Sequence, residues 1–379
     1  MRRVAAKVLR IAAAAFVIAL GAGAIVAVVD ERSWPAGQLA AVTVLATTEH
    51  TPFLRWVVAV LTKEPRLEET VIAGAPSTVV RPGGGGRWPA IVFVNGATRE
   101  GRHHPQVQRL ARGLARAGFL VVVPDLPGLR LGEITPATTA ATVRVAEATA
   151  DRGDARGGRV GLYGVSVGAS LALLAAETTP LASRLTVVGG EAPWVDLRRI
   201  VRLTTTGYYG NERYETDPYA LLAIGRSLAA GLPRGAGRSR LLQELEAVPD
   251  DDSDPVAGLS PAGHAGGTRA LVDLLLNREP ARFEELYTLL PSRVRAAVRS
   301  LSPLLEARRL AAPVELASSP HDSYFPPAES HALAGASSRV HVTVTSTFDH
   351  AVPRPSVREI GDLFRFDGFV VRFLRAARG

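Results

Sequence analysis

Two short apolar runs constrain the fold of this chain most. Residues 90–94 read AIVFV and residues 119–123 read FLVVV, so neither run alternates apolar with polar side chains. Such a run is typical of a strand whose sheet is covered on both faces. Residues 107–117, between the two runs, carry apolar side chains at helical spacing. This order predicts an α/β protein with a mainly parallel, doubly wound sheet and helices on both faces.

The rhythm of strand and helix continues along the chain with one long interruption. Further strands are expected over 159–163, 185–188, 313–317 and 340–344, with helices over 138–150, directly after Gly164, and over 356–377. Residues 195–300 lack strand-like runs and look mostly helical, which predicts a cap or lid inserted into the core. The predicted units are a segment over 1–35, an amphipathic linker or helix over 36–69, a core over 70–194 and 301–379, and a helical cap over 195–300.

The amino terminus has the pattern of a membrane anchor. Residues 11–29 form a nineteen-residue stretch without a charge, long enough for roughly 28 Å of helix. Four basic residues precede the stretch and two acidic residues follow it: Arg2, Arg3, Lys7, Arg10, Asp30 and Glu31. This asymmetry predicts a single-pass transmembrane helix with a cytoplasmic amino terminus and an extracytoplasmic main body. Cleavage as a signal peptide, giving a secreted or periplasmic protein, is the alternative.

Composition excludes several other kinds of function. The net charge is +8, but its basic residues are almost all arginines spread along the chain without a dense cluster, so no nucleic-acid partner is expected. The absence of cysteine rules out thiolate nucleophiles, iron–sulfur clusters and cysteine zinc sites. The chain has neither a phosphate-binding loop motif nor an H-E-x-x-H motif. We therefore expect neither a cofactor nor a metal.

One pentapeptide points to nucleophilic chemistry. Residues 164–168 read GVSVG, after an expected strand and before an expected helix. A nucleophile elbow requires this context, because a sharp turn lifts the serine hydroxyl above the edge of the sheet and the glycines leave room for the turn. Ser166 is therefore the candidate nucleophile.

A serine nucleophile needs a base and an acid that orients the base. His350 follows the last expected strand and is the best-placed of the eight histidines; His103 and His104 could line a pocket. Asp322 lies in the loop after the strand over 313–317, 28 residues before His350. Asp349 and Asp196 are the alternative acids. The order serine, acid, histidine is the one expected for an α/β-hydrolase.

Taken together, these segments resemble the α/β-hydrolase superfamily over residues 70–379. The resemblance rests on AIVFVNG at 90–96, GFLVVVPDLPG at 118–128, GVSVG at 164–168, SSPHDSYFPP at 318–327 and FDHAVPRP at 348–355, and is nearest to the dienelactone-hydrolase and prolyl-oligopeptidase-like esterases. It implies a Ser166–His350–Asp322 triad with oxyanion donors at the backbone N–H of Val167 and of Ala97 or Gly96. Many relatives have His-Gly where this chain has Asn95-Gly96.

The sequence thus predicts a membrane-anchored serine hydrolase that cleaves the carboxylic ester of a small molecule, and the adjacent membrane makes a lipid-like ester one candidate. A peptidase or acyltransferase with the same triad is the alternative, and a non-catalytic binding module of the same fold is a further one. Aromatic residues of the cap region either line a pocket or, more commonly, pack in a core: Trp194, Tyr208, Tyr209, Tyr214, Phe283 and Tyr287.

Overall fold

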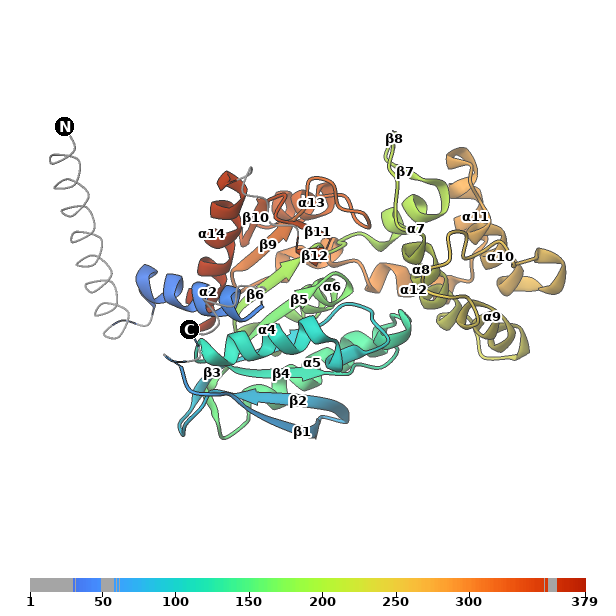
Figure 1. Ribbon diagram of the computed structural model, residues 1–379. Helices are drawn as coiled ribbons and strands as arrows, with labels where there is room; N and C mark the ends of the chain where they lie inside the picture. Colours follow the sequence, from blue (N-terminus) through green and yellow to red (C-terminus); the bar gives the residue numbers. More distant parts are fainter. Residues whose placement is uncertain are drawn as a thin grey trace, which may run out of the picture.

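An eight-stranded sheet forms the centre of the molecule (Figure 1). The computed structural model describes residues 30, 32–48, 58, 60, 62–350, 352–353 and 360–379, and the predicted anchor over 11–29 lies outside them. In chain order the strands are β1 (Arg66–Ile72), β2 (Ala75–Arg81), β3 (Trp88–Val94), β4 (Leu120–Pro124), β5 (Ala155–Val165), β6 (Leu185–Glu191), β9 (Val314–Ser318) and β10 (Val340–Val344).

The order of the strands across the sheet is β1-β2-β4-β3-β5-β6-β9-β10. All neighbours from β4 to β10 are parallel, which confirms the predicted mainly parallel sheet. The antiparallel pairs β1–β2 and β2–β4 form the remaining edge and were not predicted. β1 is an edge strand whose residues are mostly exposed, so it lacks the uninterrupted apolar run that marks β3 and β4.

Helices cover both faces of the sheet, as the apolar strands require. One face packs against α4 (Pro105–Arg116), α14 (Ile360–Ala377) and α2 (Trp34–Thr48). The other face packs against α5 (Pro136–Ala150), α6 (Val167–Ala176) and α13 (Ala328–Ala336). Because the helices connect parallel strands, the carboxyl ends of β3, β5, β6 and β9 meet at one edge.

The amino-terminal helix α2 is part of this packing. Its Ala40, Ala41 and Val44 are buried in the same core cluster as α4 and α14. Two glycines let α2 lie close to its two neighbouring helices. A Cβ on Gly37 of α2 would lie 2.7 Å from the Arg375 side chain of α14, and a Cβ on Gly113 of α4 would lie 3.2 Å from the Val44 backbone of α2. The segment over 36–69 therefore contains a helix docked on the core and the start of β1.

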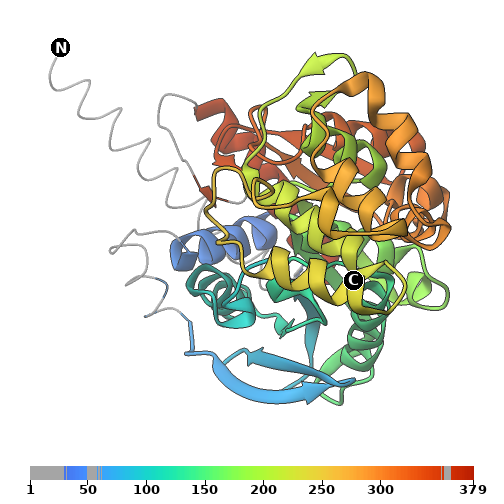
Figure 2. The same cartoon turned by 90° about the vertical axis from the view of Figure 1, so that its right-hand side faces the viewer.

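Six α-helices between β6 and β9 form an insertion that we call the cap (Figure 2). They are α7 (Leu197–Thr206), α8 (Pro218–Ala230), α9 (Ala236–Glu246), α10 (Gly266–Leu275), α11 (Phe283–Leu289) and α12 (Ser292–Ser300); two short ribbons, β7–β8 (Tyr208–Tyr209, Glu212–Arg213) and β11–β12 (Phe348–Asp349, Val352–Pro353), complete the fold. The cap shares a hydrophobic cluster with the core. The Asp250 carboxylate also joins the two, since it accepts hydrogen bonds from buried Arg226 of α8 and from Arg99 after β3.

No helix in the described part of the chain is long and apolar enough to cross a membrane.

A buried carboxyl group at the end of α6 makes stability depend on pH. Glu177 is 6% exposed, and burial, reinforced by nearby Glu306, raises its pKa to about 9. Between pH 4.5 and 9 the unfolded chain releases this proton while the folded chain retains it. The free energy of unfolding therefore falls as pH rises, by at most about 1.4 kcal/mol per pH unit from this group.

We predict that Glu177→Gln removes this contribution, because glutamine has no proton to release. Urea unfolding at pH 5, 6.5 and 8 should show a flatter decline of stability with pH than in the wild-type protein. Glu100→Gln, at an exposed position, is the control for the loss of one negative charge. Equal declines in the wild-type protein and Glu177→Gln would contradict this prediction.

Candidate active site

Ser166 lies at a sharp turn between a strand and a helix. β5 ends at Val165 and α6 begins at Val167, and Ser166 has φ 55° and ψ −126°, a conformation that a non-glycine residue rarely adopts. Its backbone N–H donates a 2.8 Å hydrogen bond to the Glu191 carbonyl at the end of β6. The structure therefore places Ser166 in the strained strand–turn–helix geometry that the GVSVG motif predicts.

The two glycines of the motif are required by contacts with backbone atoms. A Cβ on Gly164 would lie 2.2 Å from the Gly168 carbonyl oxygen, across the turn. A Cβ on Gly168 would lie 2.0 Å from the Val94 carbonyl oxygen, at the end of β3. These distances are far below van der Waals contact, so only glycine allows α6 to approach β3 at this point.

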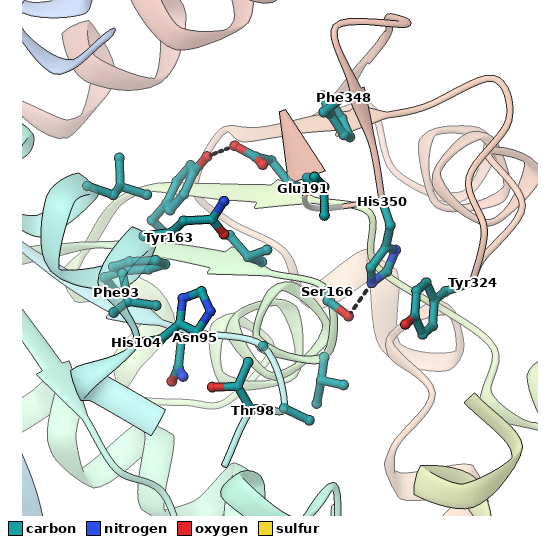
Figure 3. Close-up of a pocket in the computed structure, with 18 of the residues that line it drawn as sticks. Phe93, Asn95, Thr98, His104, Tyr163, Ser166, Glu191, Tyr324, Phe348 and His350 are labelled. Carbon is teal, nitrogen blue, oxygen red and sulfur yellow. Dashed lines mark hydrogen bonds between the residues drawn. The ribbon is translucent and has the colours of Figure 1, made fainter. Parts of the chain in front are cut away.

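The structure brings Ser166, His350 and Asp322 together in one hydrogen-bonded chain (Figure 3). His350 Nε2 lies 2.6 Å from Ser166 Oγ. His350 Nδ1 lies 3.0 Å from Oδ1 and 3.1 Å from Oδ2 of Asp322. With the proton on Nδ1, the imidazole donates to the carboxylate and accepts from the serine hydroxyl, which is the geometry of a nucleophile, a base and an orienting acid.

Asp322 is held in place by the loop that follows β9. Its carboxylate is buried, and Oδ1 accepts hydrogen bonds of 2.8 Å from the backbone N–H groups of Tyr324 and Phe325. The Tyr214 hydroxyl, from the cap, donates to the Asp322 carbonyl oxygen. Hydrogen bonds to the ionised form fix the orientation of the carboxylate toward His350.

Two aromatic rings that sequence reasoning did not assign pack on the histidine. The ring centroid of Tyr324 lies 4.2 Å from that of His350, and the centroid of Phe325 lies 5.4 Å from it. His350 itself has φ 52° and is almost completely buried. The signal was present in SSPHDSYFPP, because both rings follow the acid within three residues, but only the folded loop shows that they turn back onto the imidazole.

The predicted oxyanion donors lie beside the serine. Val167 is the first residue of α6, so its N–H is among those that have no partner within the helix. Gly96 follows β3, and a Cβ on it would lie 3.5 Å from Ser166 Cβ. Gly96, Ala97 and Val167 all line one cavity with Ser166.

Asn95, just before Gly96, has an unusual environment. Its side chain is 1% exposed, and in the described part of the chain neither amide atom has a hydrogen-bond partner. It lines the same cavity as Ser166. A buried amide without a partner costs free energy, and this one lies directly before the candidate oxyanion donor Gly96.

The cavity has a volume of about 930 Å³ and extends from the cap to α2 and α14. Of the six cap-region aromatics considered from sequence, Trp194 lines it. Phe283 and Tyr287 are buried and stack on each other, Tyr209 donates to Glu329, Tyr214 donates to Asp322, and Tyr208 lies in β7. Core packing or a structural hydrogen bond is therefore the role of most of them, and Tyr219, Tyr324 and Phe325 line the cavity as well.

The two alternative acids accept hydrogen bonds from the backbone, and one of the two histidines expected at a pocket lines the cavity. Asp349 accepts a 3.2 Å hydrogen bond from the Ser323 backbone N–H, and Asp196 caps α7. His104 lines the cavity, whereas His103 does not. Within the described ranges no group of three or more His, Asp or Glu side chains could hold a metal ion.

Comparisons with known proteins found one family match and several similar solved structures. A family model for the X-Pro dipeptidyl-peptidases of family S15 matches residues 76–223, and no curated protein matches the sequence. Similar solved structures include a puromycin-hydrolysing peptidase of Mycobacterium tuberculosis (19% identity, TM-score 0.46, covering 84% of this chain and 38% of that one), an acylaminoacyl peptidase of Pyrococcus horikoshii (16%, 0.47, 84% and 42%) and an esterase of Pyrobaculum calidifontis (16%, 0.46, 85% and 89%).

The chain thus spans 38% and 42% of the length of the two peptidases. The parallel sheet and the strained serine turn between β5 and α6 are features of an α/β-hydrolase fold, and the family match over 76–223 includes this turn.

We predict that Gly168→Ala destabilises the protein by about 3 kcal/mol, because its Cβ would overlap the end of β3. Gly335→Ala is the matched control: it also lies in a helix, α13, but a Cβ there meets nothing within 4 Å. That substitution should stabilise the protein by about 0.5–1 kcal/mol. Urea unfolding of both variants measures the change in the free energy of unfolding. Equal changes in the two variants would contradict the prediction, because helix propensity alone would then account for both.

Proposed function

We propose that the chain hydrolyses a carboxylic ester through an acyl-serine intermediate on Ser166. The observation that carries this proposal is the continuous hydrogen-bonded chain from Asp322 through His350 to Ser166. The 2.6 Å separation between Nε2 and Oγ lets the imidazole accept the serine proton directly.

In the first half of the reaction, Ser166 Oγ attacks the ester carbonyl carbon while its proton moves to His350 Nε2. Asp322 remains ionised, holds the imidazole by its Nδ1–H and stabilises the positive charge that forms on the ring. When the bond to the leaving alcohol breaks, His350 returns its proton to the alkoxide oxygen. The products of this half are the free alcohol and an ester of Ser166.

In the second half, water replaces the alcohol. His350 accepts a proton from the water as its oxygen attacks the acyl carbon, and the bond to Ser166 Oγ then breaks. The proton passes from Nε2 to Oγ, which releases the carboxylic acid and restores the serine hydroxyl.

When Ser166 attacks, negative charge develops on the oxygen of the ester carbonyl group. Hydrogen-bond donors that are already in position stabilise this charge. We assign these to the Val167 N–H at the start of α6 and to the N–H of Gly96 or Ala97 after β3. Each such donor typically contributes a factor of 10²–10³ to kcat, because it is aimed at charge that develops only in the transition state.

A peptide substrate is the second candidate, and the S15 match over 76–223 favours it. The same acyl-enzyme serves both reactions, and the difference lies in the leaving group, which is an amine for a peptide. The largely apolar side chains that line the cavity favour an ester with an apolar acyl group.

We predict that a fluorophosphonate probe labels the full-length wild-type protein and that Ser166→Ala and His350→Ala abolish the labelling. Asp322→Asn should lower kcat for p-nitrophenyl acetate by roughly 10⁴-fold, because the imidazole loses its orienting charge. Ser183→Ala, at an exposed serine, should label as the wild type does.

Absence of labelling in folded wild-type protein would contradict the proposed activity. In a labelled protein, turnover of alanyl-prolyl-p-nitroanilide without turnover of p-nitrophenyl acetate would establish the peptidase instead.

We also propose that residues 11–29 hold the protein in a membrane. The proposal rests on the uncharged length and asymmetric flanks of this segment. Removal of residues 1–29 leaves α2 intact, together with the hydrogen bond from Arg375 to the Arg32 carbonyl.

The truncated protein should therefore fold and move to the soluble fraction after lysis, while the full-length protein sediments with membranes. Full-length protein that is soluble and uncleaved would overturn the anchor.

A further inference from the structure

The cavity continues on both sides of Ser166. On one side lies a cap lobe, which we define by Trp194, Tyr219, Ala223, Ile224 and Tyr324. On the other side lies a channel between α4 and α14, roofed by α2, which we call the α4–α14 channel and define by Val44, Leu110, Leu114, Phe366, Val370 and Phe373. In Figure 3, Tyr163 and Phe93 of the channel side and Tyr324 of the cap side lie on opposite sides of Ser166.

The two lobes differ in chemistry. All six side chains that define the channel are hydrocarbon, whereas the cap lobe carries the hydroxyl groups of Tyr219 and Tyr324, with Ser227 nearby on its wall. Where the channel meets the catalytic residues, the Tyr163 hydroxyl donates to a carboxyl oxygen of Glu191, so these two polar groups satisfy each other. Burial raises the pKa of Glu191, which favours the neutral carboxyl beside the channel.

The cavity also reaches the surface among apolar side chains. Phe364 of α14 and Val352 line the cavity and are also 71% and 54% exposed. On the outer side of α2, Leu39 and Val42 are exposed as well. Exposed apolar side chains around an opening favour the approach of a hydrocarbon chain. Two charged side chains, Arg109 and Asp367, also line the cavity, and Asp367 accepts a 2.8 Å hydrogen bond from Gln38 of α2.

We propose that the α4–α14 channel binds an unbranched aliphatic acyl chain of the ester substrate, and that the leaving alcohol lies in the cap lobe. This assignment rests on the ester hydrolysis proposed above and names its substrate class, a medium- to long-chain acyl ester. The acyl carbon bonded to Ser166 Oγ stands at the inner end of the channel, and the chain extends past Tyr163 toward Phe373. Burial of each methylene favours binding by about fourfold.

The first test is the dependence of kcat/KM on acyl length, measured with p-nitrophenyl esters from acetyl to dodecanoyl. For the wild-type protein, kcat/KM should rise by about fourfold for each methylene that the channel buries. Val370→Trp narrows the channel and should lower the dodecanoyl-to-acetyl ratio at least tenfold; Leu110→Trp, on the facing helix α4, should do the same. Both positions are only partly buried, which leaves room for a larger side chain.

Ala223→Trp is the matched control, since it adds an indole ring to the cap lobe at a similarly half-buried position. It should leave the dodecanoyl-to-acetyl ratio within twofold of the wild-type value. A wild-type ratio near one, or a ratio that falls in Ala223→Trp and not in Val370→Trp, would overturn the channel assignment.

A binding measurement separates failure of the channel from failure of the proposed activity. Calorimetric titration of Ser166→Ala with decan-1-ol, which cannot react, should show binding that Val370→Trp weakens at least tenfold and Ala223→Trp does not. Hydrolysis of the acetyl ester without decan-1-ol binding would contradict the assignment of the α4–α14 channel and support the proposed ester hydrolysis. Binding of decan-1-ol, together with no ester hydrolysis by the wild-type protein, would contradict the proposed activity and support an apolar binding site.

Discussion

The structure depends on the burial of the central strands on both faces of the sheet. Strands such as β3 and β4 expose no polar face, so helices must cover both sides, and the chain must cross over between parallel neighbours. The crossovers bring the carboxyl ends of β3, β5, β6 and β9 to a single edge. Gly96, Ser166, Glu191 and Tyr324 lie at or just after these ends, which is why residues more than two hundred positions apart, such as Gly96 and Tyr324, share one cavity.

Groups from several elements hold Asp322 and His350 in place beside Ser166. Backbone N–H groups after β9 orient the Asp322 carboxylate, and a cap tyrosine donates to the same loop. The rings of Tyr324 and Phe325 pack on the imidazole, so His350 is positioned by both hydrogen bonds and van der Waals contact. The cap is therefore attached to the loop that carries Asp322 through Tyr214, and to the loop that follows β3 through the ion pair of Asp250 with Arg99.

The core of the fold could be predicted because its signals are local. Uninterrupted apolar runs identified β3 and β4, and the glycines around Ser166 identified the turn before α6. The antiparallel pair β1–β2 was not predicted, since an exposed edge strand has no such run. The candidate residues could be named from sequence: Ser166 from the GVSVG motif, and His350 and Asp322 from their order and position along the chain. The α4–α14 channel could not, because it arises where three helices distant in sequence meet over the sheet. The pairing of Tyr163 with Glu191 likewise depends on the register of β5 and β6.

The close contact of Gly168 with the end of β3 has a consequence for the energetics of the site. It fixes the start of α6, which carries Val167, against the segment that leads into Gly96. The two groups assigned to the oxyanion are thus aligned by a backbone contact rather than by a mobile loop. The entropy of aligning them is lost once, when the chain folds, and no part of that loss recurs in each catalytic cycle.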